Sequence, residues 1–378
     1  MKNVLKIFGG DKVIWVLIVI LTIYSVLAIS STVEALSYRE GNSIASYIFE
    51  HSLYLILGWG VIYLVHLIPY KFYSIFAQLM VIVAVGLLAY TLKFGKELNE
   101  SSRWMEIGPL HFQTSDFAKF ALIIFVARYL SRNQGNITDF KTGFLPVLIW
   151  IIIICGLIQP ANLSTAVMLF LVCIILLFIG RVKTRYIAAL MGTGLILGLA
   201  YFTIFKNSDD VGRTVTWENR IERFINPDPD ENLQPTLAKV AISNGGLFGK
   251  FAGHSTQKHS LPHAYSDYIF AIIIEEYGLL FGALPLVFAY LILLYRAGVI
   301  VRKSERTFPA FLAIGLSLGI VMQAMVHMGV AVGLLPVTGQ PLPFISKGGT
   351  SIMFTAAAFG IILGISRKLD EQEETQYA

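Results

Sequence analysis

The sequence predicts an all-α, polytopic membrane protein with about ten transmembrane helices and a large extracytoplasmic loop before the eighth. Composition, the distribution of apolar runs and the distribution of basic residues all point to this fold class. The chain has 378 residues, of which 56% are hydrophobic and only 14% are charged, and its mean hydropathy is +0.68. Because about a quarter of the residues of a soluble domain are charged, we expect a single integral membrane domain over residues 1–378.

Apolar runs recur along the whole chain, and most approach the ~20 residues that an α-helix needs to cross the hydrocarbon of a bilayer. They cover residues 13–30, 53–68, 73–92, 117–130, 144–158, 163–179, 186–205, 268–295, 308–335 and 352–365. The fourth and the tenth are short and are the least secure. The eighth is expected to form one continuous helix. Residues 159–162 either break a helix at membrane depth or, as we favour, form an ordinary hairpin turn.

The basic residues predict the orientation. Outside the long loop 207–262, most Lys and Arg residues fall in segments on the same side as the N-terminus, and such segments face the cytoplasm. We therefore expect cytoplasmic termini and outer loops at residues 94–114, 207–262 and 336–349. No cleaved signal peptide is expected, because no clear cleavage pattern follows the first run. The acidic tail, residues 370–378, is expected to be disordered.

The cysteines and the net charge exclude other classes of function. Cys155 and Cys173 both fall in apolar runs, so we expect small core residues and neither a disulfide nor a metal pair. The net charge of +5 lies mainly in the inner loops, where it would orient the protein in the membrane. Nothing in this pattern supports nucleic-acid binding.

Asp267 is the principal candidate for chemistry. It stands where the eighth apolar run begins, at the expected boundary of lipid and water, and carboxylates at such depths are functional candidates by default. The alternative is that Ser266 or Asp267 caps the following helix. Basic residues of the preceding loop, among them Arg220 and Lys258, would form a cationic rim suited to an anionic lipid head group.

Charged residues inside the predicted helices are weaker candidates. Glu275 lies eight residues after Asp267, which is about 12 Å deeper along a helix, where it could join a metal or proton site. We favour instead that Glu275 or Glu276 makes a buried hydrogen bond to a neighbouring helix. Lys119 lies three residues into an otherwise apolar run, where it either has a function or extends to the outer interface, as long basic side chains do.

Several short motifs follow one another in a recognisable order. They are Arg103-Trp104 with Ile107-Gly108, the run from Gln113 to Lys119, Asn162-Leu163-Ser164-Thr165-Ala166, Gly245-Gly246-Leu247-Phe248-Gly249, Ser255-Thr256-Gln257-Lys258, the Asp267 segment, and the run from Gly333 to Ser351. In this order, over nearly the whole length, the chain resembles the SEDS proteins, the FtsW and RodA group of cell-wall polymerases. The Ser255-to-Lys258 motif is more similar to FtsW than to RodA.

The chain departs from the family pattern at a few positions. Asn162 stands where aspartate is common, Lys347 where tyrosine is common, and His327 where asparagine is frequent. Tyr265-Ser266-Asp267-Tyr268 replaces the usual His-Thr-Asp-Phe. The Asn162 replacement argues against a charge role at that position, whereas Asp267 itself is retained.

The resemblance implies a peptidoglycan glycosyltransferase of the bacterial plasma (inner) membrane, acting in cell division or cell-shape maintenance. Such an enzyme polymerises lipid II into β-1,4-linked glycan and releases undecaprenyl pyrophosphate. Asp267 would be the base, or a ligand of a divalent cation, Mg²⁺ or Mn²⁺, that stabilises the leaving group. Residues expected to bind substrate are Arg103, Lys119, Arg220, Lys258, Ser346, Gly348 and Gly349. The Gly348-Gly349 pair would otherwise be a purely structural turn.

The resemblance also implies partners and leaves two rival functions. The family works with a class B penicillin-binding protein, a transpeptidase, and with other membrane proteins of the divisome or elongasome. One rival is a flippase that moves lipid II outward, although a transporter would favour polar groups at the midplane and an internal repeat. The other is a non-catalytic scaffold that recruits the transpeptidase.

Overall fold

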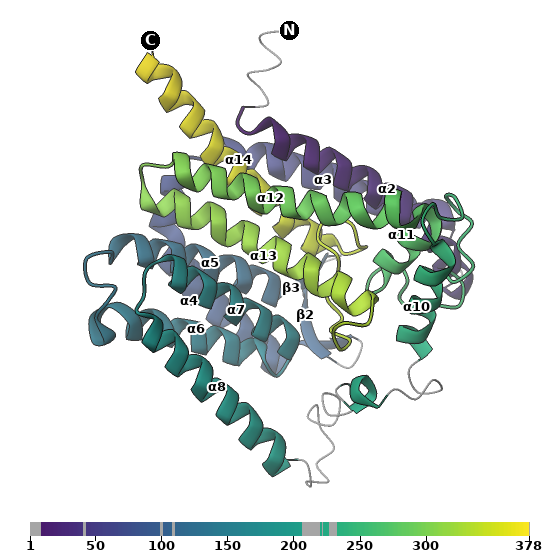
Figure 1. Cartoon of the computed structure of the whole chain (residues 1–378), viewed down its shortest axis with the longest axis horizontal. Coiled ribbons are helices and arrows are strands. Elements are labelled where there is room, and N and C mark those ends of the chain that lie inside the picture. Colours follow the sequence, from purple (N-terminus) through teal and green to yellow (C-terminus); the bar gives the residue numbers. More distant parts are fainter. Residues whose placement is uncertain are drawn as a thin grey trace.

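A computed structural model describes residues 9–40, 43–98, 101–107, 110–205, 220, 222–226 and 233–377. The described residues form a helix bundle with a small antiparallel sheet at one end (Figure 1). The first half contains α2 (Lys12–Glu40), α3 (Ile44–Leu67), α4 (Tyr70–Phe94), β1 (Lys96–Leu98), β2 (Ser101–Ile107), β3 (Leu110–Gln113), α5 (Thr114–Arg132), η1 (Phe140–Phe144), α6 (Leu145–Ile158) and α7 (Leu163–Ile179). The second half contains α8 (Thr184–Phe205), α10 (Leu233–Gly245), α11 (Ile269–Gly278), η2 (Leu279–Ala283), α12 (Leu284–Lys303), α13 (Thr307–Ala331) and α14 (Gly349–Tyr377).

Local sequence explains where several helices begin. Asn162 caps α7, because its Oδ1 accepts the backbone N–H of Thr165 at 3.1 Å, and asparagine caps a helix as well as aspartate does. Pro146 lies in the first turn of α6 and Pro285 in that of α12, where the missing N–H costs no helical hydrogen bond. Residues 159–161 form a tight turn between α6 and α7, as expected for an ordinary hairpin.

Seven helical stretches of the described residues are long and apolar enough to cross a membrane. Their outward faces carry large exposed apolar side chains such as Ile56, Leu64 and Ile75. Such surfaces suit contact with lipid and not with water. The remaining predicted runs also lie on helices, among them α5, whose side chains are mostly buried. The helix α5 occupies the interior of the bundle, so its short apolar run is explained by packing against other helices.

The two ends of the bundle differ in their contents. The start of α2, the end of α14 and the turn between α12 and α13 lie at one end, whereas the sheet, α10 and α11 lie at the other (Figure 1). We call these the terminal end and the loop end. The predicted outer loop 94–114 contains an antiparallel sheet of order β1-β2-β3, with Trp104 opposite Gln113 and Ile107 opposite Leu110.

The eighth apolar run is not the single helix that we expected. It consists of α11 and α12 with η2 between them, and it breaks at Gly278, whose φ is +71°. The break exposes backbone N–H groups, and Leu279 and Leu280 donate theirs to the carbonyls of Gly246 and Leu247 at 2.9 and 3.0 Å. The carbonyls of the loop after α10 therefore replace the helical partners that the break removes.

The acidic tail differs from expectation as well. It continues α14 as a helix to Tyr377 and does not form a disordered segment. Lys303 of α12 pairs with Glu373 at 2.9 Å, and Lys368 pairs with Glu371 at 2.7 Å along α14 itself. The i,i+3 pair Lys368–Glu371 supports the helix itself, and the Lys303–Glu373 pair joins it to α12. The expectation of disorder rested on composition alone.

Candidate active site

Asp267 lies in the turn that precedes α11 at the loop end of the bundle. Its backbone N–H donates to the carbonyl of His263 at 3.0 Å, and Tyr268, whose side chain makes no capping hydrogen bond, is the N-cap of α11. The capping alternative is therefore wrong for Asp267. Its side chain is partly buried, and among the residues that the structure describes none makes a hydrogen bond or ion pair with its carboxylate.

The Asp267 carboxylate lies beside the backbone of Gly339 and in the neighbourhood of the Arg220 cation. A Cβ atom built on Gly339 would lie only 3.7 Å from Asp267 Oδ2, so the backbone of the 336–348 segment passes beside the carboxylate. The charges of Asp267 and Arg220 both act on the side chain of the neighbouring Tyr268. Arg220 therefore lies close enough to the Asp267 turn for its charge to act there.

Ser346 fastens the Asp267 turn to the 336–348 segment. Its hydroxyl donates to the carbonyl of Ser266 at 2.8 Å and accepts the N–H of Leu342 at 2.8 Å. Next to it, the N–H of Lys347 donates to the carbonyl of Tyr265 at 3.1 Å. The structure thus places Ser346 against the backbone of the predicted catalytic turn, with its hydroxyl fully engaged by protein groups.

The 336–348 segment is non-helical chain that enters the interior of the bundle, where residues 342–346 are buried. Non-helical backbone at membrane depth needs partners from the surrounding protein. Four side chains of the three helices α2, α12 and α13 supply them: His327 to the carbonyl of Gln340, Gln323 to that of Pro341, Tyr290 to that of Pro343 and Ser25 to that of Ile345. The segment is therefore held rigidly beside Asp267.

Lys119 lies inside the bundle and does not extend to the outer interface. Its Nζ is 2.8 Å from Oδ1 of Asp116 and donates to Oε1 of Gln323 at 3.2 Å. These three residues line a cavity of about 70 Å³ between α5, α7, α13 and α14. The other walls are mainly apolar and include Met168 and Phe354. Lys119 thus supplies a paired cation to an otherwise apolar cavity.

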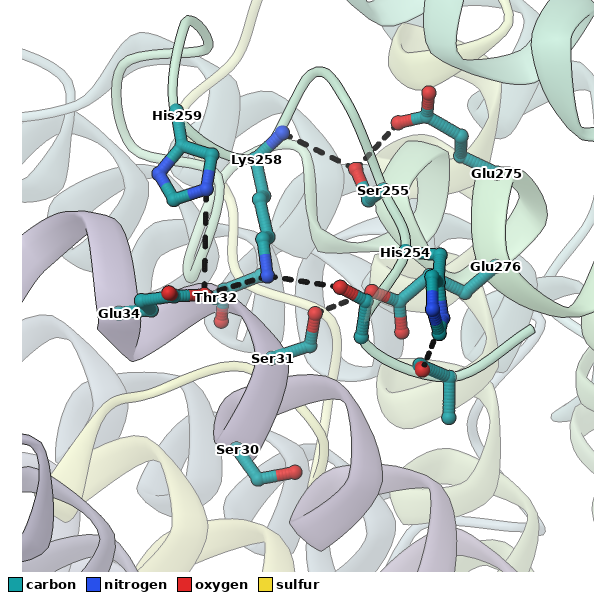
Figure 2. A network of polar contacts seen from close by, with 12 residues as sticks. Ser30, Ser31, Thr32, Glu34, His254, Ser255, Lys258, His259, Glu275 and Glu276 are labelled. Carbon is teal, nitrogen blue, oxygen red and sulfur yellow. Dashed lines mark hydrogen bonds and ion pairs between the residues drawn. The ribbon is translucent and has the colours of Figure 1, made fainter. Parts of the chain in front are cut away.

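Glu275 anchors the loop between α10 and the Asp267 turn. Its carboxylate is fully buried and accepts from Asn244, Lys250, Ser255, Thr256 and Gln257. Lys250 is also its ion-pair partner at 3.1 Å. Figure 2 shows the hydroxyl of Ser255 between Glu275 and the backbone N–H of Lys258. Both oxygens are occupied by protein donors, which makes Glu275 a poor ligand for a metal ion.

Lys258 and Glu276 connect the same loop and α11 to α2. Lys258 Nζ lies 2.6 Å from Oε2 of Glu34 and donates to the carbonyl of Gly253 at 2.9 Å. The hydroxyl of Ser31 donates to Glu276 (Figure 2), which confirms the expected buried hydrogen bond from this pair of acids to a neighbouring helix. The structure therefore places Lys258 in an ion pair between this loop and α2.

The remaining predicted residues have mixed placements. Arg220 donates to the carbonyl of Val337 at 3.2 Å, which puts it beside the 336–348 segment. A Cβ on Gly349 would lie 2.7 Å from the ring of Tyr54, so close helix packing explains this glycine, whereas a Cβ on Gly348 would meet only Ser351 at 3.6 Å. Arg103 lies in β2, and its side chain is outside the described residues.

At the candidate site, Asp267 is the side chain that would bind a divalent cation. They contain no group of three or more His, Cys, Asp or Glu side chains that could hold a metal ion. Mg²⁺, however, is commonly bound by one or two carboxylates together with substrate phosphates. Asp267 would therefore be one ligand of such a cation and does not by itself form a complete protein site.

Sequence reasoning missed the polar residues that hold the site together. Gln323 and His327 lie in the apolar run 308–335, and Asp116 lies immediately before the run 117–130. A polar side chain within such a run is costly unless it has a partner, and this was the available signal. Which backbone group each side chain serves depends on the course of residues 336–346, which no local pattern reveals.

Comparison with known proteins agrees with the fold and with the motifs. Residues 11–371 match the model of a family of cell cycle proteins, FtsW/RodA/SpoVE. The chain is 32% identical over 374 residues to a probable peptidoglycan glycosyltransferase FtsW of Geobacter sulfurreducens, covering 97% of this chain and 98% of that protein. It is 33% identical over 366 residues to the stage V sporulation protein E of Bacillus subtilis, covering 93% and 94%.

Solved structures show the same fold. RodA of Thermus thermophilus superposes with a TM-score of 0.68 at 21% identity, covering 95% of this chain and 97% of that one. A chain of a peptidoglycan synthase complex, described for its coordination of polymerization and crosslinking, superposes with a TM-score of 0.76 at 22% identity, covering 95% and 98%. With the family model matching nearly its whole length, the chain belongs to the FtsW/RodA/SpoVE family of cell cycle proteins.

Proposed function

We propose that this chain is a peptidoglycan glycosyltransferase that polymerises lipid II. The observation that carries the proposal is the carboxylate of Asp267. It is partly buried at the loop end, has no partner among the described residues and lies in a turn that Ser346 fixes to the interior 336–348 segment. A carboxylate held in this way is suited to accept a proton. The names of the relatives at about 30% identity support this activity.

The reaction follows from the chemistry of the two substrates. The Asp267 carboxylate takes the proton of the acceptor 4-hydroxyl as the hydroxyl oxygen forms a bond with C1 of the donor sugar. The bond between C1 and the pyrophosphate oxygen breaks at the same centre, so the configuration inverts to β and undecaprenyl pyrophosphate leaves. The negative charge of this leaving group favours nearby cations.

Arg220 and Lys119 are the cations that we assign to assist this step. Arg220 lies beside the 336–348 segment and acts electrostatically on Tyr268, the neighbour of Asp267. Lys119 faces a largely apolar cavity in the bundle, a setting that suits a phosphate attached to an isoprenoid chain. A divalent cation, if bound with the substrate, would be held by Asp267 and the pyrophosphate and would neutralise the leaving group.

The proposed topology completes this reaction scheme. All ten apolar runs cross the plasma membrane, both termini face the cytoplasm, and the loop end with Asp267 faces outward, where cell-wall synthesis takes place. A class B penicillin-binding protein is the proposed partner. The fold shared with the polymerising and crosslinking complex supports this. The better match of the Ser255-to-Lys258 motif to FtsW favours a role in cell division.

The test measures the polymerisation of labelled lipid II by the purified wild-type protein and by two variants, Asp267→Asn and Asp267→Ala. Loss of a general base typically lowers the rate by about 10²- to 10⁴-fold, so glycan bands on a gel should vanish in both variants while the thermal unfolding midpoint stays near that of the wild type. Glu305→Gln removes an acid at the terminal end and serves as the control.

The outcomes separate the rival functions. Glycan made by the wild-type protein and not by the Asp267 variants supports the enzyme. Movement of labelled lipid II across vesicles without any glycan product would favour the flippase instead. Near-normal polymerisation by Asp267→Asn would contradict the assigned role of Asp267, and growth of cells unaffected by either variant would favour a scaffold.

A further inference from the structure

A larger cavity lies at the terminal end of the bundle, away from Asp267. It has a volume of about 420 Å³ and lies where the first turn of α4, the first turn of α13 and the end of α14 meet. Three basic residues, Lys71, Arg306 and Lys368, line it, and its described lining contains no acidic residue. The ring of Tyr70, also in its wall, packs against Phe308 with centroids 6.4 Å apart, which fixes the start of α4 against α13.

The charge in this cavity is largely uncompensated. Among the described residues, neither Lys71 nor Arg306 has a hydrogen-bond or ion-pair partner for its side chain, and both are exposed. Only Lys368 is paired, with Glu371 at 2.7 Å. The N-caps of α4 and α13, Pro69 and Arg306, make no side-chain capping hydrogen bond. The N–H groups of these first turns therefore add to the positive potential of the basic residues.

The cavity continues into an apolar surface along α4. Phe72 and Ile75 line the cavity and are 50% and 63% exposed, and Phe76 and Leu79 extend the same surface at 50% and 55%. A ligand that used both parts would carry a negative head group and hydrocarbon chains. Free phosphate would use only the basic part and would leave the apolar surface without a function.

We propose that this cavity binds the phosphate of an anionic glycerophospholipid, with the acyl chains lying along α4. Basic pockets between membrane helices bind such head groups, and guanidinium and ammonium groups are the usual partners of phosphate. The site is remote from Asp267 and does not depend on glycosyl transfer, so it stands or fails separately from the proposed function.

The test measures lipid retention by native mass spectrometry. Purified protein is mixed with phosphatidylglycerol or with zwitterionic phosphatidylcholine, and the double variant Lys71→Gln/Arg306→Gln is compared with Arg302→Gln. Arg302 is exposed on the same helix hairpin, does not line the cavity and carries the same charge. Wild type and Arg302→Gln should retain phosphatidylglycerol preferentially, and the double variant should lose about fivefold in retention for each charge removed.

A second arm adds excess inorganic phosphate to the protein with bound phosphatidylglycerol. Retention of the lipid supports the proposal, whereas its displacement would identify the site as one for free phosphate. Equal retention of the two lipids by the wild type would also overturn the proposal. So would equal retention of phosphatidylglycerol by the double variant and Arg302→Gln. Size-exclusion profiles and unfolding midpoints are compared with those of the wild type, so that a loss of lipid in a folded variant reports on the cavity.

Discussion

At the scale of single residues, neighbouring acids in α11 have opposite environments. Glu275 accepts hydrogen bonds from five residues and pairs with Lys250. Glu276 accepts from Ser31, but its Oε2 has no hydrogen-bond partner among the described residues. Glu275 thus stabilises the loop before the Asp267 turn. Glu276 carries a desolvation cost that its contacts offset only partly.

These environments predict opposite results for the same substitution. Glu275→Gln removes the charge that pairs with Lys250, and it points an amide N–H₂ at neighbouring hydrogen-bond donors. The substitution should therefore lower the free energy of unfolding by about 3–5 kcal/mol. Glu276→Gln keeps an acceptor for Ser31 and removes a buried charge, so it should change this free energy by no more than about 1 kcal/mol. Thermal unfolding in detergent, with each variant beside the wild type, measures both. Equal losses in the two variants would contradict the assigned roles.

At the scale of elements, the break between α11 and α12 depends on glycine. A Cβ on Gly278 would lie 2.4 Å from the carbonyl oxygen of Leu247 and 2.5 Å from the nitrogen of Gly249. A Cβ on Gly245 or Gly249 would meet the carbonyls of Ile274 and Glu276 at 2.1 and 2.2 Å. The backbone of the loop after α10 therefore packs directly on α11, and the Gly245-to-Gly249 motif exists for this contact.

Gly278→Ala should destabilise the protein by at least about 2 kcal/mol, because the new methyl group meets backbone atoms and the positive φ suits only glycine. Gly298→Ala in α12 is the matched control. A Cβ there meets nothing within 4 Å, so the change should stabilise the helix by up to about 1 kcal/mol. Unfolding midpoints of the two variants report the difference. A tolerated Gly278→Ala would mean that the helix can continue through the break.

The elements also show how far the sequence could predict this fold. Every predicted apolar run is largely helical in the structure, because burial in lipid or protein leaves a strong local pattern. The break at Gly278 was missed because its partners, the carbonyls of Gly246 and Leu247, are distant in sequence. For the same reason Asp267 was identifiable as a boundary carboxylate, whereas the fixing role of Ser346 and the ion pair of Lys258 with Glu34 were not.

At the scale of the whole molecule, the bundle separates its two sites. Asp267 and the 336–348 segment lie at the loop end, and the basic cavity lies at the terminal end between α4, α13 and α14. The 336–348 segment enters the bundle and is held there by hydrogen bonds from α12 and α13. Both helices run on towards the terminal end (Figure 1). With the proposed topology, Asp267 would face the substrate on the outer side, and the basic cavity would face the anionic lipids of the inner leaflet.

This arrangement predicts which loops a reagent can reach from outside the cell. Ser260→Cys lies in the exposed loop before the Asp267 turn, and Ser304→Cys lies in the turn between α12 and α13. The native Cys155 and Cys173 are buried, so background labelling should be low. A membrane-impermeant maleimide applied to spheroplasts should label Ser260→Cys, and should label Ser304→Cys only after the membrane is permeabilised. The reverse pattern would place Asp267 on the cytoplasmic side, where the acceptor and donor could not be joined outside the membrane.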